Sequence, residues 1–325
     1  MRFARLSSMF ITGAALLASC PAFAQAGYPG KPIRLVVGFT AGGISDVLAR
    51  ALGARLSVQM GQQVVIDNRA GAGTTIAAEI VAKSPPDGYT LFMQDMTTQA
   101  INASLYKKLP YDTVKDFTPI TLVASSPLML VVHPSLPVKS VKDLIALAKS
   151  KPGQVVFASS GNGTILHLSA ETLKSMAGID MVHVPYKGSS QAVQAVLAGE
   201  VAVSFSTMPP AIPNVKAGRL RALGVSTLKR YAAAPEVPPL AEGGLKGFDI
   251  VLYSGVLGPA VLPPAVVSKL NAELIKAVNA PDVKNVYASL GVDAVTNTPA
   301  EFAAHIAADI EKLGKSVRAS GARAD

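Results

Sequence analysis

The sequence predicts an α/β fold of two lobes, each lobe a mostly parallel sheet flanked by helices. Apolar strands alternate with helices along nearly all of the 325 residues, a pattern typical of sheets covered on both faces. Three of the strands run into a turn of glycine and hydroxyl residues that opens directly onto a helix. Half of the residues are hydrophobic and only 16% are charged, so the chain is long and apolar enough to bury two cores.

The first 24 residues have the features of a secretory signal peptide and are excluded from the fold. Arg2 and Arg5 supply its positive end, Met9–Ala18 is its apolar stretch, and Ala22-Phe-Ala24 has the small-x-small pattern of a cleavage site. A competing interpretation takes Leu17-Ala-Ser-Cys20 as a lipobox, with Cys20 lipidated. Cleavage after Ala24 is the favoured interpretation, and both predict export to the periplasm.

The charge pattern argues against a nucleic-acid partner. The formal net charge is +9, or +7 once Arg2 and Arg5 leave with the signal peptide. Lysines and arginines form pairs such as Lys107-Lys108 and Lys229-Arg230 but no run, and aromatic residues do not interleave with them. A mildly positive exterior favours capture of small anions.

The expected strands, in chain order, are Ile33–Val37, Thr90–Met93, Leu128–Val132, Val155–Ala158, Met181–Val184 and Val201–Phe205. Their nearly continuous apolar character fits burial on both faces. The expected helices are Val47–Leu56, Val141–Ser150, Ile165–Met176, Gln191–Leu197 and one from Thr298 to the C-terminus.

Helix ends are marked by capping signals. Ser140 followed by Asp143, and Thr298 followed by Glu301, have the spacing of a capping box, and Pro152-Gly153 ends the first of these helices. The last helix carries one apolar stripe, formed by Phe302, Ile306, Ile310, Leu313 and Val317.

Two changes in composition predict where the chain passes between the lobes. They are Pro119–Pro127 and the Pro- and Gly-rich stretch Ala234–Gly247. The predicted first lobe is 25–124 plus 228–325, the second is 125–227, and the hinge crossings lie near 120–127 and 225–250. Two crossings make a hinge, and a hinge beside a cleft allows closure around a ligand.

The three strand-to-helix turns are the predicted binding elements. The first turn of a helix has free N–H donors and the positive end of its dipole, and glycine lets a ligand approach that backbone closely. The turns are Gly38–Asp46, Ser159–Thr164 and Pro185–Ser190. Because they come from two separated stretches, we expect a small organic anion to be held between the lobes. Gln94–Thr98, expected as a turn after its strand, adds a further edge of the first-lobe site.

Several stretches, in their order and spacing, resemble the Bug family of periplasmic solute-binding proteins of tripartite tricarboxylate transporters. The resemblance covers essentially the whole mature chain. It is carried by Tyr28-Pro-Gly-Lys-Pro-Ile33, Phe39-Thr-Ala-Gly-Gly43, Asp67-Asn-Arg-Ala-Gly-Ala-Gly73, Pro86-Asp-Gly-Tyr-Thr90, Leu105-Tyr-Lys-Lys-Leu-Pro-Tyr111, Asp116-Phe-Thr-Pro119, Ser159-Ser-Gly-Asn-Gly163, His183-Val-Pro-Tyr-Lys-Gly188 and Ala217-Gly-Arg-Leu-Arg-Ala222.

The resemblance implies a Venus flytrap fold of the type II periplasmic-binding-protein class. It implies a receptor for a small carboxylate: a di- or tricarboxylate, an acidic amino acid or an aromatic acid. Turn N–H groups, hydroxyls and bridging waters would hold the acid, and membrane subunits of a tripartite tricarboxylate transporter would receive it. A monomer without a cofactor is expected.

The chain departs from the family pattern at three positions. Gly38 and Ala41 stand where proline is common, which loosens the first turn without removing donors. Ser206 stands where an aspartate is frequent, which removes a partner for a ligand ammonium or hydroxyl group.

The predicted ligand-binding residues are Phe39, Thr40, Ala41, Gly42, Gly43, Ser45, Asp46, Asp95, Thr97, Thr98, Ser159, Ser160, Gly161, Asn162, Gly163, Thr164, His167, Tyr186, Lys187, Gly188, Ser189, Ser206 and Thr207.

Four of these residues have an alternative role. Asp46 is spaced to pair with Arg50, four residues on, and a structural role is favoured for its side chain. Asp95 is unusual in a site for an acid, so it either points away or meets a positive or hydroxyl group. His167 is equally explained as a structural histidine, and Lys187 as a solvated lysine.

Catalysis and cofactors find little support. Ser160 lacks a G-x-S-x-G context. The histidines, His133, His167, His183 and His305, have no metal-binding spacing, so no metal site is predicted. Gly71-Ala-Gly73 lacks the third glycine of a dinucleotide loop, since Ile76 stands there. A periplasmic ligand sensor for a signalling partner and, less favoured, a hydrolase using Ser160 and His167 remain as alternatives.

Overall fold

The computed structural model describes residues 27–320, so the predicted signal peptide, with Cys20 and Ala24, lies outside the described residues. The elements are β1 (Ile33–Val37), α1 (Ile44–Met60), β2 (Val64–Asn68), a 3-10 turn η1 (Ala72–Thr74), α2 (Thr75–Ala82), β3 (Thr90–Asp95), α3 (Met96–Leu105), β4 (Phe117–Val132), α4 (Val141–Ser150), β5 (Val156–Ser159), α5 (Ile165–Ala177), β6 (Val182–Pro185), α6 (Ser189–Leu197), β7 (Val203–Thr207), α7 (Met208–Lys216), β8 (Arg221–Val225), β9 (Val251–Pro259), α8 (Pro264–Val278), α9 (Pro281–Ser289), β10 (Asp293–Ala294) and α10 (Pro299–Ser320).

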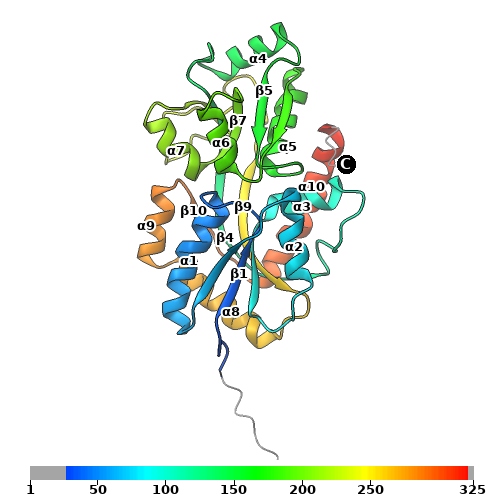
Figure 1. Ribbon diagram of the computed structural model, residues 1–325, viewed down its shortest axis with the longest axis vertical. Helices are drawn as coiled ribbons and strands as arrows, with labels where there is room; N and C mark the ends of the chain where they lie inside the picture. Colours follow the sequence, from blue (N-terminus) through cyan, green and yellow to red (C-terminus); the bar gives the residue numbers. More distant parts are fainter. Residues whose placement is uncertain (1–26, 321–325) are drawn as a thin grey trace, which may run out of the picture.

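Two lobes are joined by the strands β4 and β9 (Figure 1). The strand order is β2-β1-β3-β9-β4 in the first lobe and β4-β7-β5-β6 in the second, with β8 and β10 also paired to β4. The partner of β4 changes from β9 to β7 between Pro127 and Leu128. The finer lobe boundaries, at 124–125 and 227–228, stay a prediction.

The predicted parallel pairing holds for the outer strands and not for the crossing strands. β1 is parallel to β2 and β3, and β5 is parallel to β6 and β7. β9 is antiparallel to both β3 and β4, and β4 is antiparallel to β7 and β8. The physical reason is the connectivity: the chain leaves the first lobe along β4 and returns along β9, so the crossing strands run in opposite directions.

Ser226 ties these crossings together. Its hydroxyl accepts a hydrogen bond from Leu128 N at 2.8 Å and donates one to Ile250 O at 2.5 Å. Its backbone N–H donates to Leu128 O, and its carbonyl accepts from Ile250 N, both at 2.9 Å. The residue is completely buried. One side chain therefore fixes the point from which both crossings depart.

Several elements begin or end away from their predicted positions. The helix expected from Val47 begins at Ile44, because Gly43 already has an extended backbone that a helix can follow. The stretch Gln94–Thr98 is no turn: β3 runs to Asp95, and α3 begins at Met96. The expected strand Leu128–Val132 is the second half of the sixteen-residue β4.

The predicted helix caps are present at α4 and α10. Ser140 Oγ accepts from Asp143 N at 3.2 Å. Thr298 and Glu301 form the reciprocal pair: Glu301 N donates to Thr298 Oγ1, and Thr298 N donates to Glu301 Oε2. No helix among the described residues is long and apolar enough to cross a membrane.

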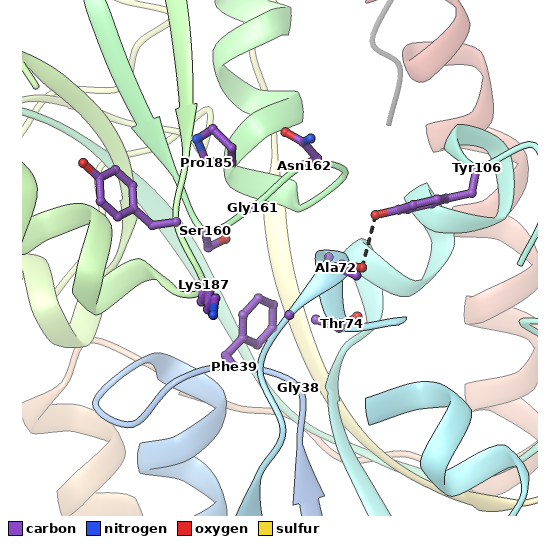
Figure 2. A pocket seen from close by; sticks show the side chains of 13 residues that line it. Gly38, Phe39, Ala72, Thr74, Tyr106, Ser160, Gly161, Asn162, Pro185 and Lys187 are labelled. Atoms are coloured by element: carbon purple, nitrogen blue, oxygen red, sulfur yellow. Dashed lines mark hydrogen bonds between the residues drawn. The ribbon is translucent and has the colours of Figure 1, made fainter. Parts of the chain in front are cut away.

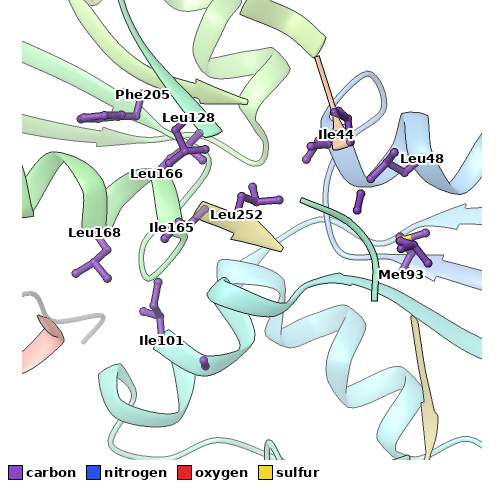
Figure 3. Close-up of a cluster of buried hydrophobic side chains, with 14 of the residues drawn as sticks. Ile44, Leu48, Met93, Ile101, Leu128, Ile165, Leu166, Leu168, Phe205 and Leu252 are labelled. Atoms are coloured by element: carbon purple, nitrogen blue, oxygen red, sulfur yellow. The ribbon is translucent and has the colours of Figure 1, made fainter. Parts of the chain in front are cut away.

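One buried apolar cluster continues through the junction of the two lobes. Leu128 on β4 and Leu252 on β9 belong to it and are at most 1% exposed. Figure 3 shows Leu252 between Ile165 of α5 and Ile44 of α1. The starts of α1 and α5 are therefore packed against this buried cluster.

Candidate ligand-binding site

Helices of both lobes begin around the junction without side-chain caps. α1 follows Gly43, α5 follows Thr164, α6 follows Gly188 and α7 follows Thr207, and none of these residues makes a side-chain capping hydrogen bond. The first N–H groups of a helix have no intrahelical partner, and the dipole there favours negative charge. Pro209 and Pro210 at the start of α7 have no N–H, and Ile165 N at the start of α5 already donates to Thr98 Oγ1. The free N–H donors therefore come chiefly from the starts of α1 and α6, and the four helix dipoles add a setting suited to an anion.

An inner chamber of about 20 Å³ lies between these helix starts. Its polar lining combines first-lobe residues at the starts of α1 and α3 with second-lobe residues before α5 and at the starts of α6 and α7. The lining residues are Phe39, Gly43, Ile44, Ser45, Asp95, Ser160, Leu166, Ser189, Thr207 and Leu252.

Buried hydroxyls around this chamber lack partners. Ser45 Oγ and Thr207 Oγ1 line it, and neither has a hydrogen-bond partner among residues 27–320. Thr40 Oγ1 and Ser190 Oγ, in the adjoining turns, are also buried and unpartnered within the described chain. A buried polar group without a partner is costly. Four such groups lie in facing turns, where they are available to a bound ligand.

An outer cavity of about 320 Å³ adjoins the same turns (Figure 2). Phe39 and Ser160 line both spaces. In Figure 2 the second-lobe residue Asn162 lies across from the first-lobe loop at Ala72, with its side chain turned away from that loop. Tyr106 donates a hydrogen bond to the Ala72 carbonyl at 3.1 Å. The remaining lining residues are Gly38, Gly71, Gly73, Thr74, Gly161, Pro185, Tyr186 and Lys187.

The lobes touch each other around these spaces. Thr40 N donates to Lys187 O at 3.4 Å, and Ile165 N at the start of α5 donates to Thr98 Oγ1 at 3.1 Å. A Cβ on Gly73 would lie 2.5 Å from the Asn162 carbonyl oxygen. The contacts are therefore close enough for one extra carbon to disturb them.

The sequence does not predict the part that Gly71–Thr74 plays in the outer cavity. All four residues have positive φ, including the non-glycine Ala72 and Thr74. Left-handed backbone costs a residue with a side chain about 1–2 kcal/mol, and such strain is concentrated at functional sites. Gly71 and Gly73 are the signal that the sequence offers, and glycines alone do not distinguish a loop that faces a cleft from other glycine-rich loops.

The chain is similar in sequence to known proteins. The model of the tripartite tricarboxylate transporter family receptor, TctC, matches residues 48–322. The chain belongs to this family. Protein BugT of Bordetella pertussis is 36% identical over 297 residues, which are 91% of each chain, so the resemblance to the Bug family is confirmed.

Solved structures share the fold of this TctC-family receptor, among them the periplasmic binding protein BugD, with a TM-score of 0.87 and 28% identity, covering 91% of this chain and 99% of that one. The structure of R. palustris Rpa4515 with adipate has a TM-score of 0.88 and 35% identity, covering 91% of this chain and 99% of that one. MatC (Rpa3494) from Rhodopseudomonas palustris with bound malate has a TM-score of 0.86 and 30% identity, covering 89% and 100%. The predicted two-lobed fold is confirmed, and the family is one of solute-binding receptors.

Seven of the predicted ligand-binding residues line the inner chamber of the receptor, and six line the outer cavity. Phe39 and Ser160 are in both sets; Gly43, Ser45, Asp95, Ser189 and Thr207 line the chamber; Gly161, Asn162, Tyr186 and Lys187 line the cavity. The residues lining neither space are Thr40, Ala41, Gly42, Asp46, Thr97, Thr98, Ser159, Gly163, Thr164, His167, Gly188 and Ser206.

Most of this last group supports the turns. Gly188 packs against Thr40, and Thr164 Oγ1 accepts from Ser160 Oγ at 3.0 Å. Ser206 Oγ lies 3.2 Å from Ser189 Oγ. Their part in binding stays a prediction.

Asp46 is held by its own helix, by the turn that precedes it and by β2. It accepts from Gly42 N at 2.9 Å and from Arg50 Nε at 3.0 Å. Burial alone would raise its pKa, but the hydrogen bonds from Arg50, Gly42 and Asn68 together outweigh burial and lower that pKa. The structure thus gives Asp46 a turn-stabilising role, with its charge already compensated.

A stack of two histidines supports the Ser159–Thr164 turn. The rings of His167 and His183 lie 4.0 Å apart, nearly parallel, and Phe157 stacks on His183 at 4.8 Å. His183 Nε2 shares a 2.6 Å hydrogen bond with Ser159 Oγ, and Gly163 N donates to His167 Nδ1 at 3.3 Å. Burial lowers the pKa of both rings, that of His183 to about 3, so both are neutral at physiological pH.

The serine and histidine that bond each other are not Ser160 and His167, the pair considered in the sequence for a hydrolase. Ser159 contacts His183, whereas Ser160 donates to Thr164. Ser159 is fully buried and also bonds Gly161 N and Gly161 O, both at 3.1 Å. A histidine with so low a pKa is a weak base, so the pair is suited to support the turn.

Replacing Ser45 with alanine is expected to weaken carboxylate binding by about tenfold or more, because a hydrogen bond to a charged group contributes about 1.5–3 kcal/mol. Unfolding stability should stay unchanged or rise, since the hydroxyl has no partner among the described residues. Calorimetric titration and thermal melting measure the two effects.

Ser254→Ala is the matched control, because the Ser254 hydroxyl is equally buried and unpartnered in the described chain but lines neither space. An equal loss of affinity in both variants, or in neither, would contradict the role of Ser45.

Proposed function

We propose that the chain is an extracytoplasmic receptor that captures a small carboxylate between its lobes and delivers it to the membrane subunits of a tripartite tricarboxylate transporter. One observation carries the proposal: uncapped helix starts and unpartnered hydroxyls of both lobes face one inner chamber. This is the chemistry that a carboxylate head needs. Family membership and the neighbours that hold adipate and malate support the same class of ligand.

The mechanism is closure about the β4 and β9 crossings. A ligand shifts the balance between open and closed forms only by binding the closed form better. Here a carboxylate in the inner chamber would meet Ser45 from the first lobe and Thr207 from the second. The rest of the ligand would extend into the outer cavity, toward Phe39 and Lys187. We place the lobe boundaries where the sequence predicts them.

Thermal melting of the purified mature protein tests ligand capture. The panel is succinate, malate, aspartate, adipate, citrate and benzoate. At a concentration 100 times its Kd, a ligand of the folded state stabilises it by about 2.7 kcal/mol, so the melting temperature should rise clearly for at least one acid. No rise with any acid of a broad carboxylate panel would overturn the proposal.

Uptake by a strain that lacks the gene tests delivery. Loss of uptake of the acid identified by melting is the expected result. Intact uptake with altered gene expression would instead support the ligand-sensor alternative.

A further inference from the structure

Asp95 lies in the chamber that we propose for the carboxylate of the ligand. Its side chain lines the chamber beside Ser45 and Thr207 and is only 2% exposed. All the hydrogen bonds that this side chain accepts from the described residues come from the first turn of α3. Oδ1 accepts from Thr97 N at 3.0 Å and Thr98 N at 3.1 Å, and Oδ2 accepts from Thr98 Oγ1 at 2.6 Å.

Most of the charged side chains on the surrounding elements are held in pairs. The buried or half-buried ionisable side chains on them are Asp46 and Arg55 on α1, His167, Glu171 and Lys174 on α5, Tyr253 on β9, and His305 and Asp309 on α10. Asp46 is paired with Arg50, Lys174 with Glu171, His305 with Asp309, and Arg55 bonds Gln59. Asp309 is the one charged side chain of the described residues recorded as acting on Asp95, and its charge is also negative.

A second carboxylate in so small a chamber creates a like-charge conflict. Two carboxylates that share a dry site cannot both ionise cheaply, so one of them holds a proton. Burial already raises the pKa of Asp95 to about 6, with Asp309 adding to the rise. A bound anion beside Asp95 would raise that pKa further.

We propose that the receptor takes up one proton as it binds its acid, and that Asp95 and the carboxylate of the ligand share this proton in the inner chamber. The inference rests on the proposed function. The protons and charges balance as follows. An ionised Asp95, an ionised ligand carboxylate and one proton from solvent form the complex, and on release the ligand and the proton both leave. Asp95 is thereby a specificity-determining residue that favours plain carboxylic acids over α-amino acids.

The uptake is linked to contact between the lobes. The Thr98 hydroxyl donates to Asp95 and at the same time accepts from Ile165 N of the second lobe. Burial lowers the pKa of His167, which disfavours the charged form of this neighbouring ring across the upper part of the pH range of the test.

Isothermal titration calorimetry from pH 6 to 8.5, in phosphate and in Tris, tests the inference with the tightest-binding acid of the melting panel. The two buffers have different ionisation enthalpies, so the dependence of the measured heat on buffer reports proton uptake. We expect uptake to approach one proton per ligand as the pH rises through 7, and Kd to increase by up to tenfold per pH unit in that range.

Two variants localise the proton. Asp95→Asn keeps a good helix cap and should bind with no proton uptake and a Kd that is flat across this range. Asp309→Asn removes a negative charge that acts on Asp95 and should lower the pKa of Asp95. The pH at which Kd begins to rise should therefore be lower than in the wild type, and the rise of Kd per pH unit should be the same. Because Asp309 lines neither the chamber nor the outer cavity, this second variant keeps the test decisive if Asp95→Asn does not fold.

Opposite results overturn the inference and separate it from the proposed function. Binding without proton uptake in the wild-type receptor, or uptake that persists in Asp95→Asn, overturns the shared proton and leaves carboxylate capture intact. Tighter binding of aspartate than of succinate without uptake also overturns it, because Asp95 would then face the ammonium of the ligand. If no acid of the panel binds, the proposed function fails and the inference fails with it.

Discussion

Replacing Gly73 with alanine should weaken carboxylate binding by roughly 5- to 150-fold, the equivalent of the 1–3 kcal/mol typical of overpacking. The added Cβ would lie 2.5 Å from the Asn162 carbonyl oxygen and 2.9 Å from the Tyr106 hydroxyl. Asn162 belongs to the second lobe, and its backbone cannot rotate away as a flexible side chain can. The lobes would therefore have to remain slightly apart, and the closed form would lose the contacts that hold the ligand.

Gly178 supplies the matched control for this experiment. Its φ of 59° is nearly identical to the 58° of Gly73, but a Cβ there meets no atom within 4 Å. Both alanine variants should lose about 1 kcal/mol of unfolding stability from left-handed backbone strain, and only Gly73→Ala should lose affinity. Titration calorimetry and denaturant unfolding of both proteins measure this. Wild-type affinity in Gly73→Ala would show that the Gly73–Asn162 contact has no part in closure.

Replacing His183 with glutamine should remove much of the acid sensitivity of the fold between pH 6.5 and 4. In the unfolded chain this histidine protonates near 6.5, whereas burial, then the fields of His167 and Lys174, lower its folded pKa to about 3. A base with a lowered folded pKa contributes stability that is present above pH 6.5 and is lost as the pH falls toward 3. The full shift corresponds to roughly 4–5 kcal/mol, and to roughly 2 kcal/mol after allowance for solvent screening of a partly exposed ring.

Asp95 titrates in the opposite sense in the same range, so the comparison must be between variants. Its pKa is raised to about 6, chiefly by burial, and an acid with a raised folded pKa stabilises the fold as the pH falls from 6 toward 4. Subtracting the pH profile of His183→Gln from that of the wild type isolates the histidine. His133→Gln, outside the stack, is the control and should follow the wild type. A His183→Gln profile parallel to the wild type would contradict the proposed neutral stack.

The helix starts could be predicted from local sequence because their causes are local. Glycine and hydroxyl residues after an apolar strand indicate the start of a helix, and these turns supply Gly43, Ser45, Ser160 and Ser189 to one chamber. The capping box of Thr298 and Glu301 is equally local. Short-range hydrogen bonds decide such features, so residue order is sufficient to predict them.

The orientation of Asp95 and the stacking of His167 on His183 could not be predicted from local sequence. The sequence indicated that an acid at Asp95 is unusual, but whether it points away or faces the ligand depends on α3 and on packing against the second lobe. The stacking of His167 on His183 joins residues from α5 and β6, and no spacing rule reports it.

The sequence by itself determined the alternation of strands and helices, the family and the turns in which anion donors are concentrated, because periodicity and turn chemistry act over a few residues. Only the tertiary structure decided that Gly71–Thr74 faces the second lobe, that the crossing strands are antiparallel and that Asp95 shares a chamber with unpartnered hydroxyls. Those features arise when segments far apart in the chain are packed together, and burial then sets the cost of each charge and hydrogen bond.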